Sequence, residues 1–275
     1  MVTIIFTIID GILYLFQFIK LVYNLRMRIR TKYLAKNKNI LYINTNKKTL
    51  DESKILKQIN GETIALLVID REKEFEKHFK KMKKVQPALQ RRRFNAPIYY
   101  AGFASVPYAI LDGHVLGDVG KVNFLEYDRS SDDYKVIVSG IQQSNNRIIV
   151  LKPKDKRTRE VALIFSLSDK INLSAVKEKI GITDKIIISD SESDSKNYSF
   201  SNEYLENLLS IVKQLMREIR LVGYTKVHIF SASRQSQSFI IGQAINKYDI
   251  DTYAYEILQG KYAWKIHIQR EMLEL

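Results

Sequence analysis

Short hydrophobic runs alternate with helix-like stretches along most of this chain. Extended runs rich in apolar and β-branched residues fall at residues 39–44, 62–69, 134–138, 147–151, 161–167, 185–189, 226–230 and 263–268. Apolar residues recur at helical spacing in residues 173–180, which precede Gly181, and in residues 202–221. This alternation predicts helices layered on mainly parallel sheets, which is the α/β fold class.

One part of this pattern occurs twice. Residues 98–127 and residues 228–255 each read as an extended run, a small polar turn, a helix-like stretch that ends at glycine, and a second extended run. Gly113 and Gly242 take the same place in the two copies. The repeat predicts two similar half-domains that face each other with pseudo-two-fold symmetry and share one site.

The most apolar stretch lies at the N-terminus. Residues 3–23 comprise 21 residues, about 31 Å as a helix, which matches the hydrocarbon core of a bilayer. A basic collar follows, made of Arg26, Arg28, Arg30 and Lys32. Because cytoplasmic flanks are enriched in basic residues, the collar predicts a single span with the rest of the chain in the cytoplasm.

Two polar residues interrupt this apolar stretch. Asp10 and Gln17 are two helical turns apart, so they share one face of the predicted helix. A polar stripe within a membrane favours association between helices or a water-lined path. A helix that packs on a partner protein, or one that lies flat on the membrane surface, fits the same pattern.

A basic, proline-containing segment divides the rest of the chain. Residues 152–159 (KPKDKRTR) are the best candidate linker between the halves. We therefore expect an N-terminal apolar helix with its collar at residues 1–37, a first half at residues 38–155 and a second half at residues 156–275.

Composition narrows the chemistry. A hydrophobic content of 45% supports a packed core, and the absence of cysteine rules out disulfides and thiolate metal sites. The histidines lack the spacing of a metal site. The sequence contains no P-loop, no GxGxxG after a strand, no Ser-His-Asp order and no recognisable carboxylate pair, so we expect neither catalytic residues nor a bound metal.

Charge points toward an anionic partner. The formal net charge is +14, and part of the excess lies in a charged helix-like stretch at residues 70–84 and in three arginines at residues 91–93. Nucleic acid, a nucleotide or anionic lipid would be attracted to such a chain. A basic surface that only keeps the protein soluble explains the same excess.

The two small polar turns of the repeat carry the most specific chemistry. In open α/β sheets, ligands bind beyond the carboxyl ends of the strands, and helix N-termini there favour phosphate. The second turn, residues 231–236 (SASRQS), offers small residues, and Arg234 adds a positive charge. Serine at a helix start is also an ordinary cap, which explains either turn alone. Two matched turns in one chain favour a shared ligand.

The first turn differs in composition from the second. It lies at residues 101–107, where Gly102 permits close approach of a ligand and Pro107 suits a helix start. The aromatic side chains of Tyr99, Tyr100 and Phe103 are candidates for stacking on a base.

At these residues the chain resembles the SAVED domain, a fusion of two CARF-like, Rossmann-type units that senses cyclic oligonucleotides in bacterial antiphage defence (CBASS and some type III CRISPR systems). The resemblance covers about residues 38–275 and rests on YAGFASVPYAILDGH followed by FLEYDR, and on HIFSASRQSQSFIIGQAI followed by TYAYEI. The chain departs from the family at Ser233 and Arg234, where proline is common. The resemblance implies a central ligand pocket formed by Tyr100, Gly102, Phe103, Ala104, Ser105, Pro107, Phe230, Ser231, Ala232, Ser233, Arg234, Gln235 and Ser236.

The resemblance also implies a function. SAVED sensors are joined to effectors, and the residues before this sensor are too few for a catalytic domain, which leaves the apolar helix as the effector candidate. We expect a non-enzymatic receptor in the bacterial inner membrane, with a cytoplasmic sensor that binds a cyclic di-, tri- or tetranucleotide. Ligand binding would rearrange a homo-oligomer and permeabilise or depolarise the membrane. No stable DNA or RNA partner is expected.

Three alternatives remain open from the sequence. The first is an enzyme that degrades its own nucleotide ligand, and the second is a soluble sensor subunit of a separate effector. The third is a nucleic-acid-binding module that uses the basic face at residues 73–93, which would show steep salt dependence.

Overall fold

The computed structural model describes residues 98–117, 122–128, 132–138, 147–153, 155–191, 201–246 and 250–274, and the strand backbones of residues 40–45 and 65–70. The predictions for the apolar N-terminal segment and for the basic face at residues 73–93 lie outside the described residues. Within the part of the chain that is described, no helix combines the length and hydropathy needed to cross a bilayer.

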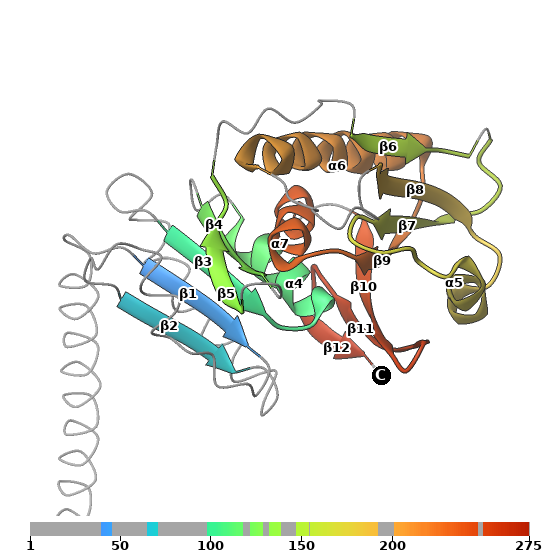
Figure 1. The fold of residues 1–275 in the computed structure, drawn as a ribbon. Coiled ribbons are helices and arrows are strands. Elements are labelled where there is room, and N and C mark those ends of the chain that lie inside the picture. The colour runs from blue at the N-terminus through green and yellow to red at the C-terminus, as the bar shows by residue number, and fades with distance from the viewer. Residues whose placement is uncertain are drawn as a thin grey trace, which may run out of the picture.

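The first sheet has the strand order β2-β1-β3-β4-β5 (Figure 1). Its strands are β1 (Ile40–Thr45), β2 (Ala65–Asp70), β3 (Ile98–Phe103), β4 (Val122–Asp128) and β5 (Asp133–Val136). All neighbours pair in parallel except β4 and β5, which form an antiparallel edge. Helix α4 (Val106–Leu116) connects β3 to β4. The predicted parallel sheet is therefore confirmed for this part of the chain.

The second sheet has the strand order β12-β11-β10-β9-β7-β8-β6. Its elements are β6 (Ile148–Leu151), β7 (Glu160–Ser166), α5 (Leu173–Ile180), β8 (Asp184–Asp190), α6 (Asn202–Val222), β9 (Lys226–Ala232), α7 (Gln235–Ala244), β10 (Asp251–Leu258), β11 (Lys261–His267) and β12 (Met272–Glu274). The four central strands are parallel, and antiparallel strands extend the sheet at both edges.

Local sequence explains the elements of the second sheet. The five central residues of β7 are all buried, as expected for a strand covered on both faces. Helix α6 begins where the Ser201 hydroxyl accepts a hydrogen bond from the Tyr204 N–H, and it ends at Gly223, whose φ of 82° lies in the left-handed region. Helix α5 ends at Gly181 as predicted.

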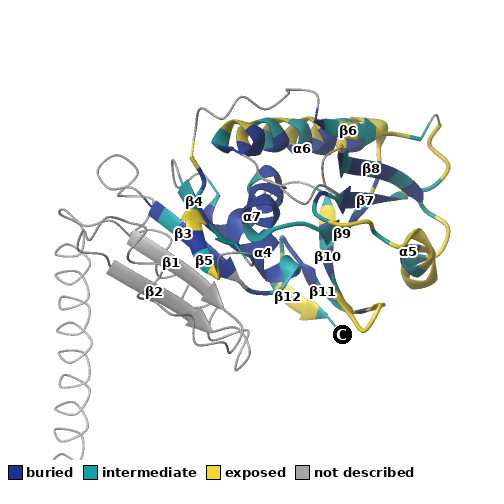
Figure 2. Cartoon of the chain, in the orientation of Figure 1, coloured by how far each residue is buried: buried dark blue, intermediate teal, exposed yellow. Residues whose placement is uncertain are grey.

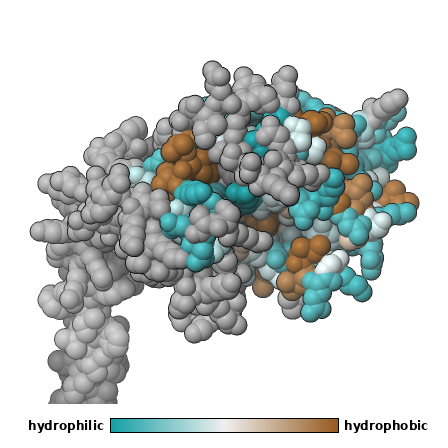
Figure 3. All heavy atoms as spheres, in the orientation of Figure 1, coloured by the Kyte–Doolittle hydropathy of each residue, from teal (hydrophilic) through white to brown (hydrophobic). Residues whose placement is uncertain are grey.

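Helices α4 and α7 lie between the two sheets (Figure 1). Helix α7 contacts β3 and β4 of the first sheet, while α4 contacts β10 and β11 of the second. Both helices are buried over most of their length (Figure 2). Their side chains belong to one hydrophobic cluster with residues of both sheets. On the face shown in Figure 3, the described surface carries separate hydrophobic patches between hydrophilic side chains.

The change from one sheet to the other comes earlier than the sequence indicated. Strand β6 pairs with β8 of the second sheet, so the crossover lies between β5 and β6 and not in the basic segment at residues 152–159. Beside β6, the Arg147 guanidinium forms a buried ion pair with Asp190 at 2.6 Å. This pairing fixes residues 147–151 to the second sheet, although they were assigned to the first half.

Candidate ligand site between the strand-to-helix turns

Helices α4 and α7 cross in direct backbone contact at two glycines. A Cβ atom on Gly113 would lie 1.8 Å from the Phe239 carbonyl oxygen, and one on Gly242 would lie 1.8 Å from the Ile110 carbonyl oxygen. Since no side chain fits at such a distance, both positions require glycine. The helices continue past these glycines, so the prediction that they end there was wrong: the glycines serve close packing, not termination.

Side chains next to the crossing make reciprocal contacts. The His114 ring lies with Nδ1 2.8 Å from the Ile245 carbonyl oxygen, and because a carbonyl only accepts, Nδ1 carries the proton. In return, Gln243 Nε2 donates to the Gly117 carbonyl oxygen at 2.9 Å. Each helix thus supplies a donor to the end of the other helix, where backbone carbonyls lack partners within the helix.

The crossing brings the two predicted turns together. Gln235, from the second turn, reaches over the first turn, and its Nε2 donates to the Ala104 carbonyl oxygen at 2.6 Å. Its Cβ lies only 2.7 Å from the position that a Cβ on Gly102 would take. Glycine at position 102 therefore makes room for a side chain of the other half, a contact that the sequence did not predict.

The second turn is held by its own serines. The Ser233 hydroxyl lies 2.7 Å from the hydroxyls of both Ser231 and Ser238, and Ser238 donates to the Arg234 carbonyl oxygen at 3.0 Å. The Arg234 N–H is taken by Gln237 Oε1 at 2.9 Å. These bonds fix the backbone before α7, which is the capping role that serine alone would explain.

The first turn is less fully bonded. The Ser105 carbonyl accepts the first N–H groups of α4, and Pro107 lies in the first turn as predicted. The Ser105 hydroxyl and the Gln235 Oε1 are buried atoms without a hydrogen-bond partner among the described residues. Buried polar atoms in this condition are uncommon in folded proteins and are expected to take a partner from water or a ligand. Both lie where the two turns meet.

Two carboxyl groups approach these helix starts from the opposite halves. Glu126 of β4 accepts hydrogen bonds from the Ser236 N–H, at 2.8 Å, and from the Ser236 hydroxyl. Burial raises the pKa of Glu126, while the bonds from Ser236 and the charge of Arg234 offset part of the rise.

On the other side, burial raises the pKa of Glu256 in β10 to about 7. The nearby Ser105 hydroxyl offsets part of this rise, although its distance and angle to Glu256 are not those of a hydrogen bond. Sequence reasoning did not select either glutamate. The repeat could have identified them, because each glutamate follows the glycine of its copy at nearly the same distance: Glu126 is 13 residues after Gly113, and Glu256 is 14 residues after Gly242.

Two of the predicted site residues are core residues. The Tyr100 ring is 1% exposed and packs against Phe124 and Phe239 with ring centroids 6.0 and 4.6 Å apart. Phe230 is 0% exposed and stacks on Tyr255 in a cluster separate from the one that contains α7. Neither ring has surface left for a base, so the structure does not support the prediction that Tyr100 stacks on one. The Phe103 side chain lies outside the described residues.

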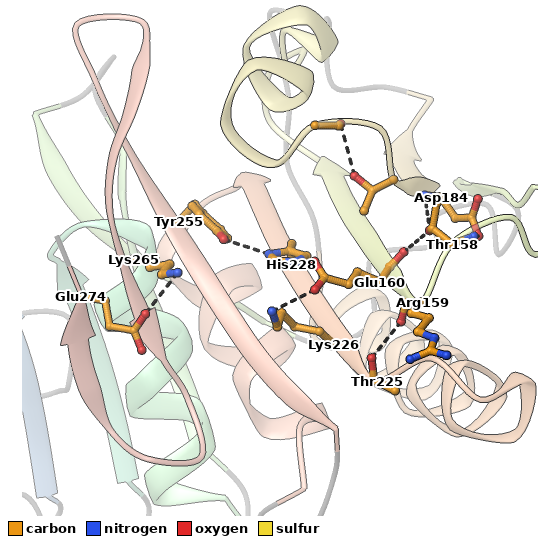
Figure 4. A network of polar contacts seen from close by, with 12 residues as sticks. Thr158, Arg159, Glu160, Asp184, Thr225, Lys226, His228, Tyr255, Lys265 and Glu274 are labelled. Carbon is orange, nitrogen blue, oxygen red and sulfur yellow. Dashed lines mark hydrogen bonds and ion pairs between the residues drawn. The ribbon is translucent and has the colours of Figure 1, made fainter.

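A second polar cluster lies at the amino ends of the strands, away from the turns (Figure 4). His228 Nδ1 is 2.8 Å from the Tyr255 hydroxyl, and Nε2 is 2.8 Å from a Glu160 carboxylate oxygen. Lys226 donates to the other Glu160 oxygen at 2.9 Å. Burial lowers the pKa of His228, so the neutral ring accepts from tyrosine and donates to glutamate. These groups satisfy one another. No group of potential metal ligands is found among the described residues.

Comparison with known proteins gives a family and a fold. The sequence profile of SAVED, the SMODS-associated and fused to various effectors sensor domain, matches residues 82–268. No curated protein sequence matches the chain.

The fold is similar to that of the Acinetobacter baumannii Cap4 SAVED/CARF-domain containing receptor with the cyclic trinucleotide 2′3′3′-cAAA (TM-score 0.55, 12% identity, covering 86% of this chain and 52% of that chain). The same receptor with 3′3′3′-cAAA gives a TM-score of 0.54 at 14% identity, covering 85% of this chain and 52% of that chain. The chain thus spans about half the length of these receptors.

Proposed function

Because this chain belongs to the SAVED family of sensor domains, we propose that it is a receptor for a cyclic oligonucleotide of bacterial antiphage defence. The observation that carries the proposal is the junction of the two turns, where Gln235 of one half reaches Ala104 of the other. Two buried polar atoms there, on Ser105 and Gln235, have no partner among the described residues. A ligand bound across this junction would contact both halves at once.

The matched contacts of α4 and α7 support a pseudo-two-fold arrangement of the halves. Gly113 meets the Phe239 carbonyl in the same way that Gly242 meets the Ile110 carbonyl. A cyclic oligonucleotide presents one nucleotide unit after another around its ring, so a ligand held where the halves meet would contact both of them. The Cap4 receptors that this fold resembles were solved with such ligands, the cyclic trinucleotides 3′3′3′-cAAA and 2′3′3′-cAAA.

Calorimetry with cyclic di-, tri- and tetranucleotides tests the receptor proposal. We expect one of these rings to bind, to raise the melting temperature, and to be recovered intact, since a receptor needs no turnover. The linear oligonucleotide of the same sequence is the matched control and should bind more weakly, because a ring loses less conformational freedom on binding. Absence of binding by every ring, together with no cyclic nucleotide released from the purified protein, would refute the proposal.

We further propose that the chain acts at the bacterial inner membrane through its apolar N-terminal segment. This part of the proposal rests on the sequence of residues 3–23 and on the basic collar that follows. Ligand binding would favour an assembled state of the sensor and group the N-terminal helices, with Asp10 and Gln17 facing one another. Such a shift requires that the ligand bind the assembled state more tightly than the separate chains.

Truncation separates the sensor from the membrane action. A chain that lacks residues 1–37 is expected to bind the ligand yet to lose ligand-dependent release of dye from liposomes, and native mass spectrometry should show ligand-dependent oligomers of the full chain. Full dye release by the truncated chain would contradict the membrane proposal and leave the receptor proposal intact. Identification of the enzyme that makes the ligand would then distinguish a CBASS system from a type III CRISPR system.

A further inference from the structure

Glu126 occupies a position that joins the two halves of the site. It belongs to β4 of the first sheet, but its carboxylate lies at the start of α7, a helix of the second half. The carboxylate oxygen Oε1 accepts from both the backbone N–H and the hydroxyl of Ser236. Two donors of one residue converge on this oxygen, so the carboxyl group is held in a defined place.

These bonds leave the second carboxylate oxygen for another partner. Both contacts of Glu126 use Oε1, and Oε2 has no hydrogen bond with any residue that the structure describes. An ionised carboxylate can accept about four hydrogen bonds through its two oxygens. Glu126 therefore presents a fixed, unused acceptor beside the second turn.

The same contact keeps phosphate away from α7. A helix N-terminus normally attracts an anion, but here the Glu126 side chain already accepts the hydrogen bond of the Ser236 N–H. A phosphate at this point would have to displace the Glu126 side chain from the Ser236 N–H. A neutral hydrogen-bond donor would instead be attracted, and the exocyclic amino groups of adenine, cytosine and guanine are such donors.

The first half lacks this arrangement. Pro107 lies six residues before Gly113, as Ser236 lies six residues before Gly242, and proline has no N–H to hold a carboxylate. Correspondingly, Glu256 on that side accepts no backbone N–H of a described residue, and the nearby Ser105 hydroxyl lowers the Glu256 pKa but does not reach hydrogen-bond distance and angle. The fixed acceptor is thus present at one turn and missing at the other.

We propose that Glu126 is a specificity-determining residue that accepts a hydrogen bond, through Oε2, from the exocyclic amino group of a ligand base. The inference rests on the proposed receptor function and goes beyond it, because it states which chemical group of the ligand is read and from which half. Bases with an amino group bind at the second turn, and uracil is rejected there.

Substitution of Glu126 by glutamine tests the inference. The glutamine side chain keeps an oxygen for the Ser236 N–H but places an NH₂ group where the free acceptor was. The ligands are the tightest-binding amino-bearing ring, with 3′3′3′-cAAA as the first choice, and its analogue whose bases lack the amino group. The wild-type chain should prefer the amino-bearing ring by roughly 10- to 100-fold, the range for one hydrogen bond to a charged group. In E126Q this preference should vanish.

Three results would overturn the inference. E126Q could keep the preference, it could bind both rings more tightly because Glu126 only competed with phosphate, or the wild-type chain could bind a uracil ring best. If the wild-type chain binds no cyclic oligonucleotide, the receptor proposal itself fails, which is a different outcome. The matched control is Glu218→Gln. Glu218 lies on α6, is exposed and pairs with Lys152, so this substitution should leave both affinities unchanged. Melting temperatures of both variants show that the fold is retained.

Discussion

The helix crossing and the two turns lie within a few residues of each other, yet they relate the halves in different ways. At the crossing, each helix presents a glycine to a backbone carbonyl of the other, at the same 1.8 Å from the missing Cβ. At the turns, one side has a serine that is bonded to a glutamate, and the other has a serine with no such bond. The packing of the halves is matched, whereas the surface offered to a ligand is not.

This difference indicates where the chain can vary. A backbone contact tolerates no side chain on either helix, so the two halves must agree there. A ligand site gains from unlike walls, because each wall then reads a different part of the ligand. The following predictions test that division, from the largest expected effect to the smallest.

Alanine at either crossing glycine should destabilise the chain strongly and to a similar extent. Gly113→Ala and Gly242→Ala each place a methyl group against a backbone carbonyl that cannot move alone, so we expect a loss of about 3 kcal/mol, the upper end for an added methyl group in a packed core. Urea denaturation measures this loss. Gly102→Ala meets the Gln235 Cβ, which is fixed to the start of α7, and should cost about 2 kcal/mol, because the remaining Gln235 atoms can turn away.

The double variant at the crossing gives a sharper test. Once one methyl group has separated the helices, the second should fit at little further cost, so the two losses should not add. Additive losses, or a single loss below about 0.5 kcal/mol, would show that the crossing is not a shared backbone contact.

Glu256 should make the stability of the chain depend on pH. Burial raises the pKa of Glu256 to about 7 from 4.5, so the folded chain binds this proton more readily than the unfolded chain. The resulting stabilisation is complete below the unfolded pKa and disappears as pH rises to about 7. Relative to the wild-type chain, Glu256→Gln should therefore gain on the order of 3 kcal/mol between acid and mildly alkaline pH.

A control with the opposite sign is available. The hydrogen bond from Lys152 lowers the pKa of Glu218, so its contribution is present above the unfolded pKa and disappears as pH falls. Relative to the wild-type chain, Glu256→Gln should gain stability as pH rises toward 7, whereas Glu218→Gln should lose stability as pH rises through the acid range in which Glu218 ionises. Denaturation curves across pH measure both effects. A Glu256→Gln curve parallel to that of the wild-type chain would show that Glu256 titrates normally.

Alanine substitutions of the two turn serines should differ in their effect on stability, because only Ser236 forms a hydrogen bond to a glutamate. Ser236→Ala takes a hydrogen bond from a partly buried carboxylate, and we expect a loss of about 1–2 kcal/mol. Ser105→Ala removes a hydroxyl that has no bonded partner among the described residues, so its effect should be within about 0.5 kcal/mol. Thermal unfolding of both variants measures the difference, and equal losses would contradict the asymmetry.

Modest losses are expected at the reciprocal donors. His114→Ala and Gln243→Ala each remove one side-chain donor to a carbonyl and should each cost about 1 kcal/mol. His114→Gln makes the two helices alike and should restore most of the loss, which thermal unfolding would show. If His114→Gln is no more stable than His114→Ala, the imidazole has a role beyond this hydrogen bond.

Much of the fold could be predicted from the sequence because strand and helix periodicity is local. The predicted strand at residues 185–189 and the predicted helix at residues 202–221 agree closely with β8 and α6. In both segments the spacing of apolar residues indicates which face is buried. The crossover between sheets could not be placed, because whether β6 joins β5 or β8 depends on a distant partner strand.

The site was predicted only in outline for a related reason. The matched turns predicted a shared site. The role of Gly113 and Gly242 could not be predicted, because each contacts a carbonyl some 130 residues away and glycine is equally common at helix ends. Tyr100 was predicted to stack on a base because the alternation of apolar and polar residues does not show which face of a strand is covered by a helix. Glu126 was missed because its partner, Ser236, is on the other half.

The shared core has a consequence for how the chain can be divided. The ring of Phe239 on α7 packs between Tyr100 and Phe124 of the first sheet, with centroids 4.6 and 5.4 Å away. A cut between β5 and β6 would leave each fragment with an apolar helix surface that only the other fragment covers. The fragments should aggregate when produced alone and reassemble when produced together. By this measure the two sheets constitute a single folding unit, and a biosensor built by splitting this protein would report on assembly of its core.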